Sequence, residues 1–530
     1  MLRFFNRRIF LSAGFFMFFA LLVHAEQPQF PDAQRLLIES IGGDSAVAKL
    51  KGIKTIETFG TGNTNGFKSR FHMIVAPPDR IYLDIQHEGY SLGRIVNGNR
   101  GWIKTLNGKF TPMNSTELSQ SKGSFFAETF QFLFPDSSGR IPRVDSKSLN
   151  PNHACWKVMA PSGKDGEIPF YIDATSKNIL ATEGYMDNMH IRSVNTEFDT
   201  ISGIIFPTKT ISRIEETKFE LTQEIDSILL RNTIRTTVFQ PSAGKTSANF
   251  PKGVVEISIP IEYVNGHILV RATINGKRKL KFILDTGCST NLFHEESIRD
   301  LSLPTIGTLP FRGIGGIQEM PLVRIDTMEI GGLKFLPQAA GVTNISGVAS
   351  ETISNAEMGG LLGFDFFSDF PVTINLEQLR MTIHDPKNFT ISNSAIGFPL
   401  EFYSQVPTIS ATICGVSGVF LVDLGNAAGV LLHQSFINQY QLESCLNSID
   451  FNSQSVAAIG GTVGVSFYRA KSFSLGTINY ENLAVAVPDS SSGISGTSDI
   501  AGNFGSLFFK PYEITFDYPN RMLYLRLLKN

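Results

Sequence analysis

The sequence predicts a mainly β protein in which an N-terminal α+β domain is followed by two similar β lobes. Many of the 43 phenylalanines fall in short alternating runs, which favours strands over long helices. Turn signals separate these runs, and the second half of the chain repeats an ordered set of landmarks. A chain of 530 residues is too long for one hydrophobic core. It should divide into roughly two to four domains.

Residues 1–25 are predicted to be a secretory signal peptide. Arg3, Arg7 and Arg8 precede an apolar run from Ile9 to Val23, and the small residue Ala25 ends a cleavage pattern. A retained membrane anchor is the alternative, although the run is short for a span. The arginine pair also resembles a twin-arginine export motif, but the apolar core fits the general secretory route better. We expect a periplasmic or secreted protein with no stable membrane span after cleavage.

Composition excludes several function classes. The formal net charge of −2 argues against nucleic-acid binding, which needs a basic excess. The nine histidines are scattered without ligand spacing, so neither a metal site nor a cofactor is expected. His294 and His433 each follow an Asp-containing motif, and we expect both on the surface of a first helix.

The N-terminal domain is predicted to span residues 26–238. An amphipathic helix is expected near Ala33 to Leu50, interrupted by Gly42-Gly43, and a second helix around Thr116 to Phe134. The rest is expected to be strands, with hairpin turns at Asn97-Gly98 and Asn107-Gly108.

Two phrases of this domain, Val96-Asn-Gly-Asn-Arg-Gly-Trp102 and Tyr171-Ile-Asp-Ala-Thr-Ser-Lys-Asn-Ile-Leu180, loosely resemble the lipoprotein-carrier (LolA-like) family. The resemblance implies an open, curved half-barrel able to bind an acyl chain or an extended peptide. A β domain that only packs against or positions an enzyme is the alternative.

A polar run rich in turn residues, within 239–254, is predicted to be an interdomain linker. Beyond it the chain repeats itself, which predicts one lobe over 255–385 and a second over 386–530. The first copy contains, in order, Phe282-Ile-Leu-Asp285-Thr-Gly287, Gly313-Ile-Gly-Gly316, Met328-Glu-Ile-Gly331 and Gly360-Leu-Leu-Gly363. The second contains Phe420-Leu-Val-Asp423-Leu-Gly425, Ala458-Ile-Gly-Gly461, Phe473-Ser-Leu-Gly476 and Gly502-Asn-Phe-Gly505.

An apolar strand that leads into Asp-Thr-Gly is the arrangement needed for hydrolysis by a pair of carboxyl groups. The strand brings Asp285 to a buried edge, and Gly287 lets the chain turn there and present a backbone N–H. The hydroxyl of Thr286 can bond to the opposing loop and hold Asp285 and Asp423 coplanar. Two neighbouring carboxyl groups share one proton, so one acts as a general base on water while the other protonates the substrate.

The Asp285-Thr286-Gly287 context, the glycine turn and Leu361-Leu362-Gly363 resemble the retropepsin-like aspartyl proteases. The resemblance covers roughly Val255 to Asn530. It implies two retropepsin-like lobes packed as a pseudo-dimer around one cleft, with the glycine turn near a flap. It also implies an aspartic endopeptidase with Asp285 and Asp423 as the catalytic pair.

The second copy departs from the family pattern at Leu424, where Thr or Ser is expected, and at Asn426. Leucine cannot make the hydrogen bond between the loops, so half of that contact is expected to be missing. Asp423 and Gly425 remain, which favours an asymmetric but working site. The alternative is an inactive protease fold that binds peptide or lipid in the periplasm.

Two further features leave alternatives open. Cys414 and Cys445 lie in one predicted lobe and are the more plausible disulfide pair among four cysteines. The Ser/Gly-rich stretch Ser490 to Ser498 is predicted to be a mobile loop. Neither glycine-turn segment offers a tyrosine, so no flap residue is assigned.

Overall fold

The computed structural model describes residues 30–133, 139–150, 153–162, 166–186, 189–215, 217–242, 244, 246–313, 316–346, 353–354, 357–449, 454–458, 461–489 and 499–528. The predicted signal peptide and the Ser490 to Ser498 stretch lie outside these residues. So do residues 314–315 and 459–460, which belong to the two glycine motifs of the sequence. Within the described part of the chain, no helix combines the length and apolar character needed to cross a membrane.

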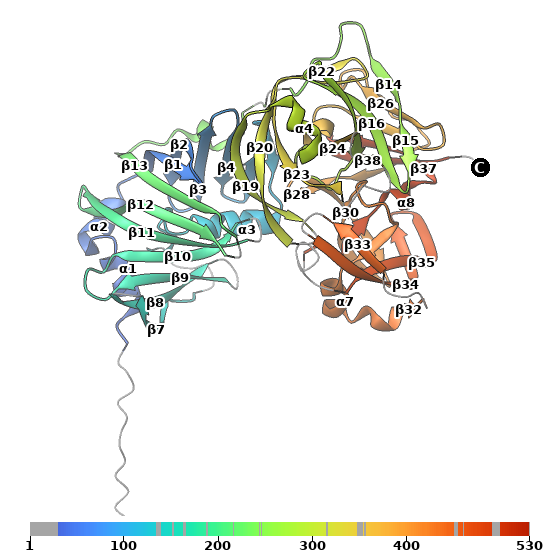
Figure 1. The fold of residues 1–530 in the computed structure, drawn as a ribbon. Helices are drawn as coiled ribbons and strands as arrows, with labels where there is room; N and C mark the ends of the chain where they lie inside the picture. Colours follow the sequence, from blue (N-terminus) through green and yellow to red (C-terminus); the bar gives the residue numbers. More distant parts are fainter. Residues whose placement is uncertain are drawn as a thin grey trace, which may run out of the picture.

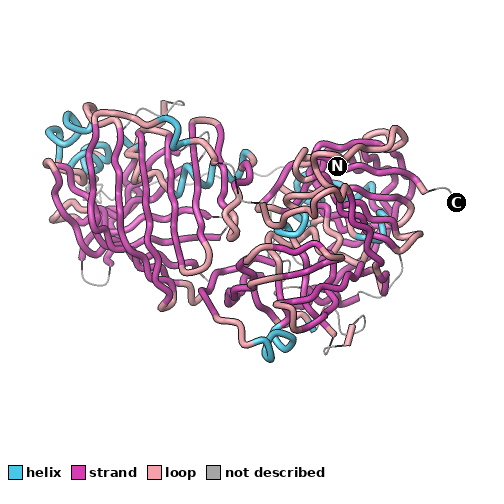
Figure 2. The backbone as a smooth tube through the Cα atoms, turned by 90° about the horizontal axis from the view of Figure 1, so that it is seen from above, coloured by secondary structure: helices cyan, strands magenta, loops and turns pink. Residues whose placement is uncertain are grey.

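The protein is mainly β, as predicted, and its strands form four sheets. One large curved sheet makes up the N-terminal domain, and the other three sheets form a second body beside it (Figure 1). Seen from above, the two bodies lie next to each other (Figure 2).

The N-terminal sheet has 13 antiparallel strands in the spatial order β6-β5-β4-β3-β2-β1-β13-β12-β11-β10-β9-β8-β7. These strands are β1 (Thr55–Thr64), β2 (Phe67–Ala76), β3 (Arg80–His87), β4 (Ser91–Asn97), β5 (Arg100–Lys104), β6 (Phe110–Pro112), β7 (Arg143–Asn150), β8 (His153–Ser162), β9 (Gly166–Asp173), β10 (Ile179–Met186), β11 (Met189–Ile201), β12 (Ile204–Ile214) and β13 (Glu220–Arg231). The predicted turns join β4 to β5 and β5 to β6, where Gly98 and Gly108 adopt positive φ.

The first predicted helix is confirmed as two short helices, α1 (Ala33–Glu39) and α2 (Gly43–Leu50). The break falls where predicted, because Gly42 and Gly43 have φ values of 108° and 76°, which side chains disfavour. Asp32 accepts a hydrogen bond from the backbone N–H of Arg35 and caps α1.

The second predicted helix is shorter than expected. Helix α3 (Ser115–Ser124) begins with Asn114 and Glu117 in a reciprocal capping arrangement and ends ten residues before Phe134. The following chain leaves helical geometry, and its phenylalanines enter the core: Phe126 and Phe132 both contact Phe170. Tertiary packing therefore overrides the local helical pattern.

The first lobe contains β14 (Glu256–Pro260), β15 (Glu262–Val264), β16 (His267–Ile274), β17 (Arg278–Leu284), β18 (Leu292–His294), β19 (Thr305–Gly313), β20 (Gly316–Ile325), β21 (Met328–Ile330), β22 (Leu333–Phe335), β23 (Gln338–Thr343), β24 (Met358–Leu362), β25 (Val372–Asn375) and β26 (Arg380–His384), with helices α4 (Glu295–Ile298) and α6 (Phe364–Phe367). The second contains β27 (Ile396–Pro399), β28 (Glu401–Tyr403), β29 (Val406–Ile413), β30 (Val416–Val422), β31 (Val430–Leu432), β32 (Leu446–Ser448), β33 (Gln454–Ala458), β34 (Gly461–Leu475), β35 (Ile478–Pro488), β36 (Gly502–Phe504), β37 (Tyr512–Asp517) and β38 (Met522–Leu527), with α7 (Gln434–Tyr440) and α8 (Ser506–Phe509).

Both lobes arrange corresponding strands in the same way. In the first, β17 pairs in parallel with β24, which pairs antiparallel with β18. In the second, β30 pairs in parallel with β36, which pairs antiparallel with β31. The strand that precedes each Asp is therefore a central strand with a neighbour on both sides.

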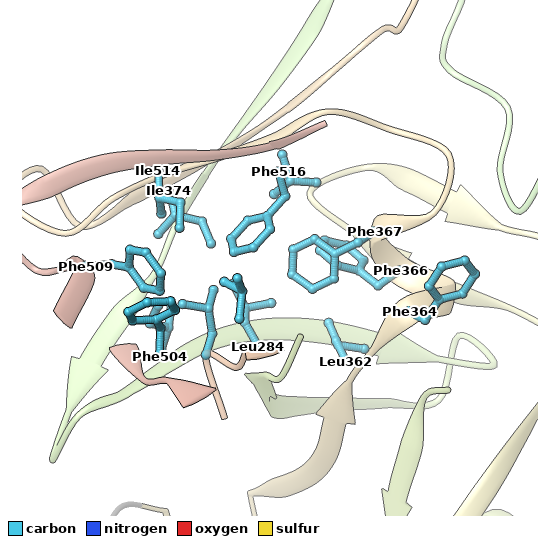
Figure 3. Packing of buried hydrophobic residues seen from close by; sticks show 14 of the residues in the cluster. Leu284, Leu362, Phe364, Phe366, Phe367, Ile374, Phe504, Phe509, Ile514 and Phe516 are labelled. Atoms are coloured by element: carbon cyan, nitrogen blue, oxygen red, sulfur yellow. The ribbon is translucent and has the colours of Figure 1, made fainter. Parts of the chain in front are cut away.

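A six-stranded sheet contains strands of both lobes, in the order β14-β26-β25-β37-β38-β27. The lobes meet where β25 pairs with β37, with Ile374 opposite Ile514. Beneath this sheet lies one continuous apolar core that contains Leu284 of the first lobe and Phe504 of the second (Figure 3). The two aspartate-bearing strands consequently rest on a shared, closely packed support.

The N-terminal domain is fastened to both lobes. The turn between β5 and β6 places Lys109 against Asp369 of the first lobe, with 2.6 Å between Nζ and Oδ2. At the start of α3, Glu117 accepts a hydrogen bond from the backbone N–H of Ser404 in the second lobe at 2.6 Å. The predicted linker is also packed, since Phe239 is fully buried and Ala248 forms a β-bridge with Phe335.

Cys414 and Cys445 form a disulfide between β29 and the segment that follows α7. Cys155 and Cys288 are free and buried. The pair that the sequence favoured is therefore the one that the structure contains.

Candidate active site

Asp285 lies directly after β17, at the base of a cleft between the lobes. Its backbone N–H donates to the carbonyl of Leu362 on β24, at 2.9 Å. The chain then turns, so that the N–H of Cys288 donates to the Asp285 carbonyl at 3.1 Å. The side chain of Asp285 is only 8 % exposed.

Asp423 occupies the same place in the second lobe, directly after β30. Its backbone N–H donates to the carbonyl of Phe504 on β36, at 2.9 Å. Its Oδ1 accepts hydrogen bonds from the backbone N–H groups of Gly425 at 2.9 Å and Asn426 at 3.1 Å. Backbone donors therefore orient this carboxyl group from within its own loop.

Each glycine of the two motifs lies against the carboxyl group of the opposite lobe. A methyl group on Gly287 would sit 2.5 Å from Oδ1 of Asp423, and one on Gly425 would sit 2.5 Å from Oδ1 of Asp285. No side chain fits at either position. The structure thus brings Asp285, Gly287, Asp423 and Gly425 together.

Thr286 joins the two loops. Its hydroxyl donates to the carbonyl of Val422 at 2.7 Å and accepts from the backbone N–H of Leu424 at 2.9 Å. The hydrogen bonds between the loops therefore come from Thr286 of the first lobe, as the sequence indicated. Leu424 is fully buried and belongs to the apolar core shared by the lobes, so its side chain contributes packing where a hydroxyl is expected.

The two carboxyl groups are electrostatically linked. Burial raises the pKa of Asp285 well above its ordinary value, and the charge of Asp423 raises it further. Burial also raises the pKa of Asp423, against the N–H groups of Asn426 and Gly425, which favour its ionised form. The pair therefore retains one shared proton to a higher pH than an isolated aspartate does.

We expect Asp285→Asn to stabilise the fold at neutral pH. Because the folded pKa of Asp285 is raised, the native state keeps a proton that the unfolded chain releases above about pH 3.9. The contribution of this group to stability is present below that pH and is lost as the pH rises through the folded value. Thermal melting of both proteins across acidic and neutral pH measures the difference. Equal melting temperatures at neutral pH would contradict the raised pKa.

Three polar side chains near the carboxyl groups were not predicted as site residues. The Cys288 thiol donates to Asp285, and burial raises its own pKa well above the ordinary value, so it remains a neutral donor. In the second lobe the Asn426 amide donates to Asn503 at 2.7 Å, and the Asn503 amide points toward Oδ2 of Asp423 at 3.5 Å. The sequence signal for two of them was their position, because Cys288 and Asn426 each stand three residues after a motif aspartate.

The prediction for His294 and His433 is wrong, because both are fully buried. Each lies at the N-cap position of a helix, α4 and α7. The His433 ring bonds to the carbonyl of Ile500 at 3.0 Å, and burial lowers its pKa to about 4. Both rings pack inside the lobes rather than toward the cleft. Among the described residues, no three His, Cys, Asp or Glu side chains gather in a way that could hold a metal ion.

A cavity of about 1030 Å³ opens above the carboxyl pair and continues into the N-terminal domain. Phe311 on β19 of the first lobe and Phe467 on β34 of the second both line it. The hairpins β19–β20 and β33–β34 carry the two glycine segments, where Gly313 pairs with Gly316 and Ala458 pairs with Gly461. Phe311 belongs to the first of these hairpins, whereas Phe467 lies beyond the second and pairs with Ala486 of β35.

The first-lobe hairpin is held by the N-terminal domain. Leu309 and Ile317 pack against a cluster of Met189, Ile214 and Phe219 on the curved sheet. This contact fixes the hairpin that lies over Asp285, and it was not visible in the sequence because it joins residues about a hundred positions apart.

Comparison with known proteins agrees with this geometry. A protein-family model described as aspartyl protease matches residues 270–366, which include Asp285, Thr286 and Gly287. The match confirms the resemblance read from those residues. A comparison with curated proteins found no match.

Among solved structures, the chain is similar to a LolA superfamily protein from Nitrosomonas europaea. The TM-score is 0.30 and the sequence identity 12%, over 40% of this chain and 98% of that chain.

Proposed function

We propose that this chain is an exported aspartic endopeptidase, acting in the periplasm or after secretion, whose substrates are peptides or proteins. The match to the aspartyl protease family model supports a protease-type fold for the first lobe. The observation that carries the proposal is the reciprocal contact of Gly287 with Asp423 and of Gly425 with Asp285. This contact places the two carboxyl groups next to each other in the cleft, without a side chain between them.

The reaction follows from the shared proton. The ionised carboxyl group takes a proton from a water molecule, whose oxygen bonds to the carbonyl carbon of the scissile peptide. The protonated carboxyl group gives its proton to the carbonyl oxygen. A proton from the pair then passes to the amide nitrogen, while one hydroxyl of the tetrahedral carbon returns its proton to the other carboxyl group. The carbon–nitrogen bond breaks, the amine leaves, and the pair again holds one proton. No covalent intermediate and no cofactor are required.

The alternative, a protein that binds peptides without cutting them, depends on Leu424. Two observations favour the working site. The backbone N–H of Leu424 still bonds to Thr286, and Asp423 still receives two N–H groups from its own loop. The missing hydroxyl therefore leaves the carboxyl groups oriented.

The pH dependence of cleavage tests this proposal. We expect kcat/KM to fall as pH rises, when the shared proton leaves the pair, since the general acid is then lost. Because the pKa of Asp285 is raised by burial and by Asp423, the fall should occur above the pH at which an ordinary aspartate ionises, about 3.9. Initial rates on an unfolded protein substrate measure the profile. A rate that rises continuously into the alkaline range would exclude a carboxyl pair.

A further inference from the structure

The catalytic cleft and the N-terminal sheet share one cavity. The residues around it include Asp285 and Asp423 of the lobes together with residues of β1 to β5 and β10 to β13. Figure 1 shows the curved sheet opening toward the lobes. A polypeptide bound at the carboxyl pair can therefore continue onto the sheet without leaving the cavity.

Apolar side chains line the cavity on both halves of the sheet. On β2 to β5 they are half-buried: Met73, Leu83, Ile85, Leu92 and Ile103. On β10 to β13 apolar side chains such as Ile191 and Phe206 stand beside uncharged polar ones, of which Ser193 bonds to Ser212 and Thr210 to Asn195. This lining suits an extended segment with apolar side chains.

The charges around the cavity do not suit an anionic lipid. Arg94 bonds to Ser121 at 2.9 Å, and Lys104 pairs with Asp84 at 2.6 Å. Both side chains therefore already bond within the protein, and the partner of Lys104 carries a compensating charge. A fatty acid or phospholipid brings a negative group with it, and that group would meet the carboxyl groups of the dyad and of Glu128 in the same cavity.

Glu128 gives the cavity its third acidic group. It lies between α3 and the short 3-10 helix Gln131–Leu133, and it is open to the cavity. The residue is exposed, and the protein atoms around the cavity partly desolvate its carboxyl group and raise its pKa to about 7. No basic side chain among the described residues pairs with it in an ion pair. A carboxyl group in this setting is stabilised by a cation that a ligand supplies.

We propose that the substrate is a polypeptide with an extended apolar segment that carries a basic side chain. The segment lies on the N-terminal sheet, the basic group pairs with Glu128, and a neighbouring peptide bond enters the cleft between Asp285 and Asp423. This inference rests on the proposed function and adds the substrate class. The N-terminal domain is then part of the substrate site rather than a separate carrier.

Binding to the full mature chain carrying Asp285→Asn tests the inference without turnover. The probes are a fluorescent apolar peptide with one Lys, the same peptide with Gln in place of Lys, and palmitate, followed by anisotropy or displacement. We expect the Lys peptide to bind about tenfold more tightly than the Gln peptide, the size expected of one charge-assisted hydrogen bond. Glu128→Gln should remove that difference.

Two substitutions on the sheet form a matched pair. Met73→Glu places a charge in the cavity lining and should weaken both peptides at least about tenfold. Leu229→Glu changes a residue on β13 that is already 40 % exposed and does not line the cavity, so it should leave binding unchanged. Circular dichroism and melting curves show that each variant is folded. Equal binding by the two variants, or palmitate binding more tightly than either peptide, would overturn the inference.

Cleavage separates this inference from the proposed function. With the wild-type chain, a short peptide that reaches only the carboxyl pair is compared with one extended by the apolar, Lys-containing segment. The extension should lower KM about tenfold with little change in kcat. Peptides that bind as predicted but are never cut would sink the endopeptidase and leave the binding site standing, whereas cutting that ignores the extension would sink the inference alone.

Discussion

Gly425→Ala should lower kcat/KM by at least about 100-fold while the protein remains folded. The added methyl group would sit 2.5 Å from Oδ1 of Asp285 and would force that carboxyl group out of its place. The side chain of Asp285 can rotate away, so the main loss falls on activity rather than on stability. Steady-state kinetics together with a melting curve measure the two effects separately.

The same loop provides the control for this substitution. Gly429 lies four residues further on, and a methyl group there would meet no atom within 4 Å. Gly429→Ala should therefore keep activity within a small factor of the wild type. An equal loss of activity in both variants would mean that any substitution in this loop impairs activity. The reciprocal glycine contact would then not explain catalysis.

Thr286→Val should destabilise the protein by about 2–5 kcal/mol, since it removes the hydroxyl that bonds to both the Val422 carbonyl and the Leu424 N–H. Valine has nearly the same shape, so the loss comes from two backbone groups left buried without partners. The second lobe has Leu424 in the equivalent place and cannot compensate. Activity should fall as well, because the loops then lose their connection through Thr286. Denaturant unfolding of the variant and the wild type gives the stability difference.

Thr412→Val is a suitable comparison. Thr412 lies on β29, where its hydroxyl bonds to the hydroxyl of Ser417 at 3.0 Å in an exposed position. Water replaces such a bond, so this variant should stay within about 0.5 kcal/mol of the wild type. A Thr286→Val protein as stable as Thr412→Val would show that the bonds between the loops contribute little.

The central residues of the site could be predicted from the sequence because they are encoded in short, repeated segments. Asp285, Thr286 and Gly287 follow one apolar strand, and Asp423 and Gly425 follow its counterpart. The structure places all five in one cleft. The local backbone geometry alone determines where each aspartate carboxyl group lies relative to the strand that precedes it.

Features that depend on tertiary packing were missed. The helix expected to reach Phe134 ends at Ser124, because the phenylalanines after it are drawn into the core. His294 and His433 each follow an Asp-containing motif and were predicted to be exposed, but both are buried within the lobes. The N-terminal sheet also lines the cavity above the carboxyl pair, and this arrangement depends on contacts between distant segments that no sequence periodicity reveals.

Cleavage of an unfolded protein substrate by the chain from residue 26 onward, beside Asp285→Asn and Asp423→Asn, tests the account most directly. We expect the wild type to cut at acidic to near-neutral pH, and each variant to lose activity by at least about 10²–10⁴-fold, the usual contribution of a general acid or base. Both variants should remain folded, because asparagine fills nearly the same volume. A folded wild type that does not cut, or a variant that cuts as fast as the wild type, would contradict the assignment of Asp285 and Asp423 as the catalytic pair.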